Sequence, residues 1–258
     1  MATMRIKYLA TSIMMQMHLQ VFFPEKVFCD PDSDEAKQLK VLWLLHGEGG
    51  DSSDWMRLSR MEHFAQEHNL ALIMPNMDNS MYMNMAHGAY PYFTYMTEEL
   101  PPYIRSLLSI LPEARERNYV AGVSTGGYGA VKWALNKPDF FGGCACLSGE
   151  LDIRTAMREK AADGKLGDDW LAAFGSESYV TENENDLLFL ARRLAKEGMD
   201  LPDIYLVNAV GDESAERNAQ AVKLLADDGV RVRHVCENEE IGWKFWDKQL
   251  EEYIRTFN

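Results

Sequence analysis

The stretch GVSTGGYGA, residues 122–130, matches the pattern G-x-S-x-G around Ser124. An apolar run precedes it and a helical pattern follows it, which is the strand–turn–helix context of a nucleophilic serine. The turn that lifts such a serine out of a sheet is sharp and strained, so its neighbours must be small. The stretch therefore predicts that Ser124 is a nucleophile at the carboxyl end of a central strand.

A second turn lies at the end of the first central strand, in LLHGEGG at residues 44–50. An H-G pair there can direct a backbone N–H toward the serine. We expect the N–H groups of Glu48 and Thr125 to form an oxyanion hole, in which one donor typically contributes about 2.7 to 4 kcal/mol. His46 is interpreted as a brace for this turn and not as a base. A carboxylate is unfavourable beside an oxyanion, so we expect the Glu48 side chain to face solvent or a cationic partner.

Asp212, in VGDE at residues 210–213, follows an apolar strand. The residues alone leave two interpretations open: Asp212 orients an imidazole as the acid of a triad, or it caps the helix expected from Ala215. Its position after the nucleophile and at a strand end favours the triad. The chain order Ser, Asp, His then places the base further on, but no histidine follows His234. His234 itself is predicted to lie on a strand, well below the site.

Apolar runs and helical patterns alternate along the chain, which predicts an α/β fold with a mostly parallel central sheet and helices on both faces. The expected central strands are residues 40–45, 71–74, 119–123, 144–147, 204–210 and 230–236, with an edge hairpin at 6–9 and 14–23. The expected helices are residues 56–68, 94–110, 127–136, 186–196, 215–227 and 243–257. Asn185 is expected to cap the 186–196 helix. We expect a single domain over residues 1–258, with about 151–202 as a lid-like insertion over the strand ends.

Composition narrows the class of partner. A formal net charge of -14 argues against nucleic acid and against an anionic membrane surface, because both would repel the protein, and favours neutral or cationic ligands. The four cysteines include no C-x-x-C pair, so reduced thiols and a cytoplasmic location are expected. No segment predicts a membrane span, and no ligand spacing implies a metal or an organic cofactor.

Further motifs extend over nearly the whole chain: DW at 54–55, MPN at 74–76, ELP at 99–101, LSG at 147–149, NDL at 185–187 and WKFW at 243–246. Together with the serine motif and LLHG, they resemble the esterase D and tributyrin esterase group of α/β-hydrolases, which includes short-chain carboxylesterases and S-formylglutathione hydrolases. The resemblance implies an α/β-hydrolase fold, a small acyl ester or thioester as substrate, and no cofactor. It also makes a homo-oligomer reasonable.

In that group a histidine stands two residues ahead of the first tryptophan of W-x-x-W, and here that position is Ile241. The apolar stripe that includes Trp243 and Trp246 fixes the register of the last helix, so a shift of alignment does not recover a histidine. The resemblance places His87 near the mouth of the pocket, where it is a weak alternative base. We therefore expect a serine esterase whose activity is weak or lost. The alternative is a catalytically disabled hydrolase that binds a ligand or a partner.

Overall fold

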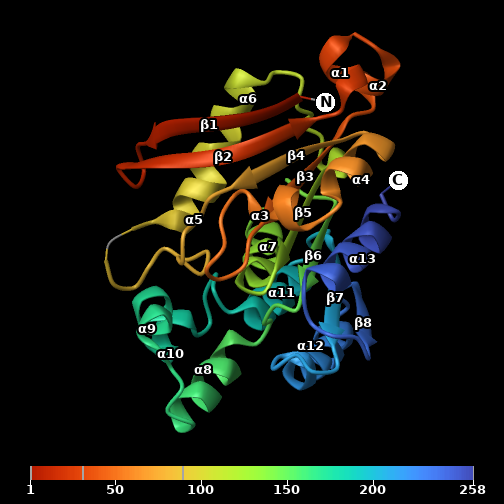
Figure 1. Cartoon of the computed structure of the whole chain (residues 1–258). Coiled ribbons are helices and arrows are strands. Elements are labelled where there is room, and N and C mark those ends of the chain that lie inside the picture. The colour runs from red at the N-terminus through yellow and green to blue at the C-terminus, as the bar shows by residue number, and fades with distance from the viewer. Residues whose placement is uncertain (1, 31, 89, 258) are drawn as a thin grey trace.

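An eight-stranded sheet forms the centre of the molecule, in the order β1-β2-β4-β3-β5-β6-β7-β8. The structure is a computed structural model that describes residues 2–30, 32–88 and 90–257. β2 pairs antiparallel with β1 and with β4, and all other neighbours are parallel (Figure 1). The strands are β1 (Ala2–Ala10), β2 (Met15–Phe23), β3 (Lys40–Leu45), β4 (Leu70–Pro75), β5 (Asn118–Val123), β6 (Gly143–Leu147), β7 (Asp203–Ala209) and β8 (Val232–Glu237).

The predicted strands are all present, and the mostly parallel sheet is confirmed. The edge hairpin is also confirmed, although β1 begins earlier than expected, at Ala2. Its half-buried and exposed side chains alternate along the whole strand, and its pairing with β2 continues to Phe23. Alternation is typical of an edge strand with one covered face, whereas the continuous apolar run of β3 fits a strand covered on both faces.

Helices cover both faces of the sheet and divide the core into two clusters. On one face α6 (Leu100–Leu107), α7 (Thr125–Asn136), α11 (Leu187–Lys196) and α12 (Ala215–Asp227) share a cluster with Trp43 and Trp133. On the other face α3 (Asp54–Leu58), α4 (Met61–Glu67) and α13 (Trp243–Ile254) pack around Trp55. The shorter elements outside the segment between β6 and β7 are α1 (Glu25–Cys29), α2 (Asp34–Lys37), α5 (Tyr92–Thr94), the π-helix η1 (Tyr95–Glu99) and the 3-10 helix η2 (Arg115–Arg117).

The predicted helix over residues 56–68 is wrong as a single helix, because the chain breaks between α3 and α4. The Arg60 N–H donates to Asp247 of α13 at 2.8 Å instead of continuing a helical ladder. The Ser59 hydroxyl donates to the Trp55 carbonyl at 2.5 Å. A contact with a distant helix therefore overrides the local periodicity. The helix predicted over 94–110 is likewise divided among α5, η1 and α6.

The segment between β6 and β7 contains two different parts. Its first part, α8 (Ile153–Ala162), α9 (Asp168–Phe174) and α10 (Glu177–Val180), lies beyond one end of the sheet (Figure 1). Its second part, α11, packs against α7 and α12 and is the crossover helix between two parallel strands. Asp186 caps α11 by accepting the Phe189 N–H at 3.2 Å, so the expectation that Asn185 is the cap was wrong.

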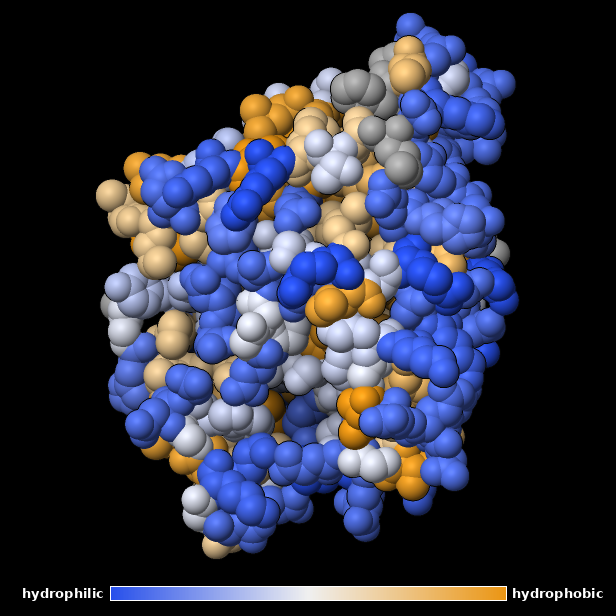
Figure 2. Space-filling model, viewed as in Figure 1, coloured by the Kyte–Doolittle hydropathy of each residue, from blue (hydrophilic) through white to orange (hydrophobic). Residues whose placement is uncertain are grey.

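The surface in view is mostly hydrophilic and is hollowed between the region of α8 and α9 and that of α12 (Figure 2). Cys144 and Cys146 are buried, Cys29 and Cys236 are exposed, and all four are free thiols. In the described part of the chain, no helix is both long and apolar enough to cross a membrane.

Candidate active site

Ser124 stands in a sharp turn between β5 and α7. Its φ of 53° and ψ of -121° lie in a region that residues other than glycine rarely occupy. Its N–H donates to the Leu147 carbonyl of β6 at 2.9 Å, which holds the strained turn. A Cβ at Gly122 would overlap the Gly126 carbonyl, and a Cβ at Gly126 would lie 2.5 Å from the His46 carbonyl oxygen. Packing therefore requires the glycines that the sequence shows, and the predicted strand–turn–helix is present.

The two amides predicted to form an oxyanion hole are available. The N–H groups of Glu48 and Thr125 donate to no acceptor among the described residues. The two turns touch, since a Cβ on Gly47 would lie 3.4 Å from the Ser124 Cβ. Thr125 is the first residue of α7, where the helix dipole favours negative charge. Negative charge that develops on an oxygen beside Ser124 would be stabilised by this arrangement.

His46 braces the turn at residues 44–50 (the oxyanion turn), as interpreted from the sequence. Its Nδ1 lies 2.8 Å from the Gly47 carbonyl oxygen, and its Nε2 accepts the Met77 N–H at 2.9 Å. Burial lowers the pKa of His46, which favours the neutral ring that such a donor and acceptor pair needs. The Tyr82 hydroxyl donates to the His46 carbonyl at 2.7 Å, and the buried Lys132 Nζ donates to the Tyr82 carbonyl at 3.0 Å. The turn thus rests on a hydrogen-bonded, buried support.

Asp212 is held at the end of β7. Its Oδ2 accepts the Ala209 N–H at 2.8 Å and the Asn208 side-chain amide at 3.1 Å. Ser214, not Asp212, is the N-cap residue of α12, so the structure excludes the capping interpretation. Asp212 Oδ1 has no hydrogen-bond partner among the described residues, and Asp212 lines the same cavity as Ser124. An acid that orients an imidazole needs these two properties.

Ile241 lies in the loop between β8 and α13, at the position where the resemblance implies a histidine. Its side chain is 42% exposed and lines the cavity together with Ser124 and Asp212. Its Cδ1 would lie 4.0 Å from a Cβ built on Gly211, the residue before the acid. An aliphatic group therefore lines the cavity at the sequence position where the resemblance implies an imidazole.

The register of α13 is fixed by its tryptophans. Trp246 Nε1 donates to the Ser148 hydroxyl at 2.9 Å, and Trp243 packs edge-on against Trp55 with ring centres 5.0 Å apart. Sliding α13 by one residue would break both contacts. The position of Ile241 at the cavity is thus a consequence of tertiary packing.

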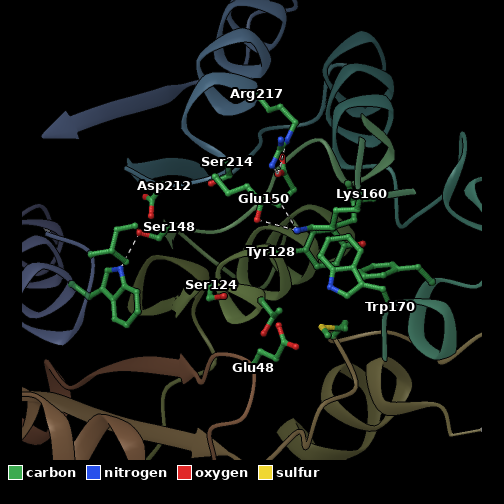
Figure 3. A pocket seen from close by; sticks show the side chains of 17 residues that line it. Glu48, Ser124, Tyr128, Ser148, Glu150, Lys160, Trp170, Asp212, Ser214 and Arg217 are labelled. Carbon is green, nitrogen blue, oxygen red and sulfur yellow. Dashed lines mark hydrogen bonds and ion pairs between the residues drawn. The ribbon is translucent and has the colours of Figure 1, made fainter. Parts of the chain in front are cut away.

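The cavity that joins these groups has a volume of about 340 Å³ (Figure 3). One part of the cavity wall consists of the oxyanion turn, the sharp turn around Ser124 (the elbow), the loop after β7 and the start of α13. Helices α8 and α9 supply an aromatic and aliphatic wall with one cation: Ile153, Lys160, Trp170 and Phe174.

Ion pairs inside the cavity were not predicted from the sequence. Glu150 accepts a hydrogen bond from Arg217 Nε at 2.8 Å, and Lys160 contacts Glu213 at 2.8 Å while lying 5.2 Å from the Trp170 ring centre. Burial raises the pKa of the Glu150 carboxyl to about 7, against the lowering effect of Arg217. The partners in each pair lie far apart in the chain, so no local pattern marks them.

The described histidines do not complete a triad, because none of them lines the cavity. His87 is exposed, and its backbone N–H donates to the Ala172 carbonyl of α9 at 2.9 Å. His234 lies on β8 as predicted, with its Nε2 3.3 Å from Asn208 Oδ1. In the described ranges, no group of three or more His, Cys, Asp or Glu side chains is placed to hold a metal ion.

Comparison with known proteins relates this chain to esterases. The family model described as "Putative esterase" matches residues 10–257. An acetyl esterase of Caldicellulosiruptor saccharolyticus is 29% identical over 240 residues, which cover 90% of this chain and 87% of that protein. The substrate-bound structure of the fluorophosphonate-binding serine hydrolase FphF of Staphylococcus aureus has a TM-score of 0.85 at 30% identity, covering 98% of this chain and 97% of that one. An S-formylglutathione hydrolase of the same organism, FrmB, gives a TM-score of 0.84 with the same identity and coverage.

Proposed function

Because the chain belongs to this esterase family and is a carboxylic ester hydrolase of the α/β-hydrolase fold, we propose that it cleaves short acyl esters or thioesters at Ser124, slowly. One observation carries the proposal. Ser124, Asp212 and the residues of both free amides line a single cavity, and Ile241, at the sequence position where the resemblance implies the base, lines it too. This lining supports a site that can stabilise an oxyanion but has no histidine, among the described residues, to remove the serine proton.

In the proposed reaction Ser124 Oγ attacks the acyl carbon, and the oxyanion forms against the N–H groups of Glu48 and Thr125. The leaving group departs as an alkoxide or thiolate and takes a proton from solvent, and water then hydrolyses the acyl-enzyme to the carboxylic acid and free Ser124. The serine proton passes to solvent, since no described histidine lines the cavity. In subtilisin, removal of the triad histidine costs about 2 × 10⁶ in kcat and leaves roughly 10³ to 10⁴ over water. Slow turnover with intact substrate binding is the expected behaviour.

The test is hydrolysis of p-nitrophenyl acetate by the wild type, Ser124→Ala and Ile241→His, with Ile241→Ala as the matched control. We expect slow wild-type hydrolysis that Ser124→Ala abolishes. Ile241→His should be at least about a hundred-fold faster, because general-base catalysis contributes about 10² to 10⁴. Ile241→Ala should hydrolyse the ester no faster than the wild type. Wild-type hydrolysis that survives Ser124→Ala would contradict the proposal, and an equal gain in Ile241→Ala would mean that space, not the imidazole, limits the rate.

Ile241 also favours a second function, that of a disabled hydrolase whose cavity binds an acyl compound or a partner. The side chain is aliphatic, and the cavity around it is open. A silent wild type together with an active Ile241→His would favour this function over slow catalysis. An inactive Ile241→His would instead mean that the cavity itself has diverged from an esterase site.

We propose that residues 1–258 form one domain and that α8 to α10 act as the lid over the cavity. Trp170 and Phe174 of α9 support the lid assignment because both line the cavity. Assembly as a homo-oligomer and a cytoplasmic location stay predictions.

A further inference from the structure

The two cations that line the cavity are paired with carboxylates of the protein itself. Lys160 Nζ lies 2.8 and 2.9 Å from the two carboxylate oxygens of Glu213. Arg217 pairs with Glu150 at 2.7 Å and with Glu159 at 2.5 Å. An anionic group of a substrate would have to displace one of these carboxylates. Neither cation that the structure places at the cavity is therefore free to bind it.

Glu48 is the opposite case. Its side chain is exposed, lines the cavity (Figure 3) and forms no ion pair with any residue in the described ranges. The backbone of the two residues after Glu48 is held by hydrogen bonds. The Gly49 N–H donates to Asn79 Oδ1 at 2.8 Å, and the Gly50 N–H donates to the Gly47 carbonyl at 3.1 Å. The carboxylate is thus attached to a fixed turn and has no internal counter-ion there.

This carboxylate is attached close to the reacting serine, since a Cβ built on the preceding residue, Gly47, would lie 3.4 Å from the Ser124 Cβ. A negative charge there opposes an oxyanion that forms at Ser124 and attracts a positive charge on a bound substrate. When a substrate cation pairs with Glu48, the repulsion of the oxyanion is cancelled and the attraction of the substrate is gained. The Glu48 side chain therefore slows the cleavage of neutral esters and favours the cleavage of cationic ones.

We propose that Glu48 makes the cavity selective for esters and thioesters that carry an ammonium or similar cationic group near the scissile bond. The inference rests on the proposed function, because it assigns the substrate class of the Ser124 site. Glu48 sets the selectivity through its side-chain charge, whereas its backbone N–H serves the oxyanion whatever side chain it carries. The formal net charge of -14 acts in the same direction by attracting cations to the surface.

The test compares acetylthiocholine with its uncharged carbon isostere, 3,3-dimethylbutyl thioacetate, by thiol release. The proteins are the wild type, Glu48→Gln and the control Glu67→Gln, which removes the same charge from an exposed position on α4 outside the cavity lining. We expect the wild type to prefer the cationic thioester by about five- to ten-fold in kcat/KM. Glu48→Gln should lose this preference and hydrolyse the neutral thioester a few-fold faster, whereas Glu67→Gln should behave as the wild type.

Two results would overturn the proposal. One is an unchanged preference for the cationic thioester in Glu48→Gln. The other is an equal loss of kcat/KM on both thioesters, which would assign the Glu48 side chain a role in the turn itself. Calorimetric titration of Ser124→Ala and of Ser124→Ala with Glu48→Gln measures the same preference as binding, without turnover. If neither thioester is hydrolysed even in an Ile241→His background, the proposed function fails, and the titration still decides the selectivity. Equal affinity of Ser124→Ala for the two thioesters would reject it.

Discussion

The two sides of the cavity differ in how tightly the fold constrains them. On the nucleophile side, Gly126 has no room for a methyl group, and the buried His46 is hydrogen-bonded through both ring nitrogens. On the base side, Ile241 is 42% exposed, and Val210, directly after β7, is 60% exposed. A Cβ on Gly211 would meet only the Ile241 Cδ1, at 4.0 Å.

The contrast shows why one half of a catalytic site can change while the other stays. Ser124 and its glycines are part of the packing between β5, β6 and α7, so most substitutions there would cost stability. Ile241 lies in an exposed loop, where a histidine and an isoleucine are both compatible with the fold. The loss of the base would therefore remove chemistry without weakening the scaffold.

The two sides of the cavity differ most clearly if Asp212 contributes to turnover only when an imidazole is present at position 241. In the Ile241→His background, Asp212→Asn should lower kcat by about a thousand-fold or more, because the acid fixes the tautomer and stabilises the imidazolium; the same change in a serine protease costs about 10⁴. In the wild type, Asp212→Asn should change turnover little. Steady-state kinetics on p-nitrophenyl acetate measures both, and an equal loss in the two backgrounds would show that Asp212 only supports the loop after β7.

On the nucleophile side, Gly126→Ala should lower the free energy of unfolding by about 3 kcal/mol or more, because the new methyl group meets backbone oxygens at 2.5 Å that cannot move away. Gly167→Ala is the matched control, since its Cβ would meet nothing within 4 Å. That control should stay within about 0.5 kcal/mol of the wild type. Urea denaturation measures both, and similar losses in the two variants would contradict the packing argument.

The pH dependence of stability tests the role of Lys132 in the buried support of the oxyanion turn. Burial lowers its pKa to about 7, so above that pH the unfolded state binds the additional proton and the folded state does not. Its contribution to stability is therefore present at high pH and is lost as pH falls toward 7. From pH 7.5 to 9, the free energy of unfolding of the wild type should rise by about 2 kcal/mol relative to Lys132→Met. Parallel denaturation curves at the two pH values would show that the buried amine stays protonated.

The smallest effect is expected on the base side. Ile241→Ala should change the free energy of unfolding by less than about 1 kcal/mol, because the side chain is 42% exposed. Leu147→Ala, at a fully buried position of β6, should cost about 2 to 5 kcal/mol. Thermal denaturation distinguishes the two, and a large loss in Ile241→Ala would mean that the isoleucine has acquired a structural role.

The active-site candidates differ in how far the sequence could identify them. Ser124 was predicted because its glycines record a steric demand that is local in the chain. Asp212 was predicted only as one of two interpretations, since a carboxylate after a strand can cap a helix or face a site. The structure excluded the cap because Ala209 and Asn208 bind the carboxylate from the end of β7.

What the sequence alone determined is the set of features whose cause is local: the apolar runs that became strands, the glycines around the elbow and the absence of a histidine after His234. What only the tertiary structure decided depends on residues distant in the chain. Asp247 breaks a helix at Arg60, Arg217 meets Glu150, and Glu48 is left without a counter-ion among the residues that the structure describes. Periodicity and steric size are properties of neighbouring residues, whereas charge pairing and cavity shape arise only when the sheet brings remote segments together.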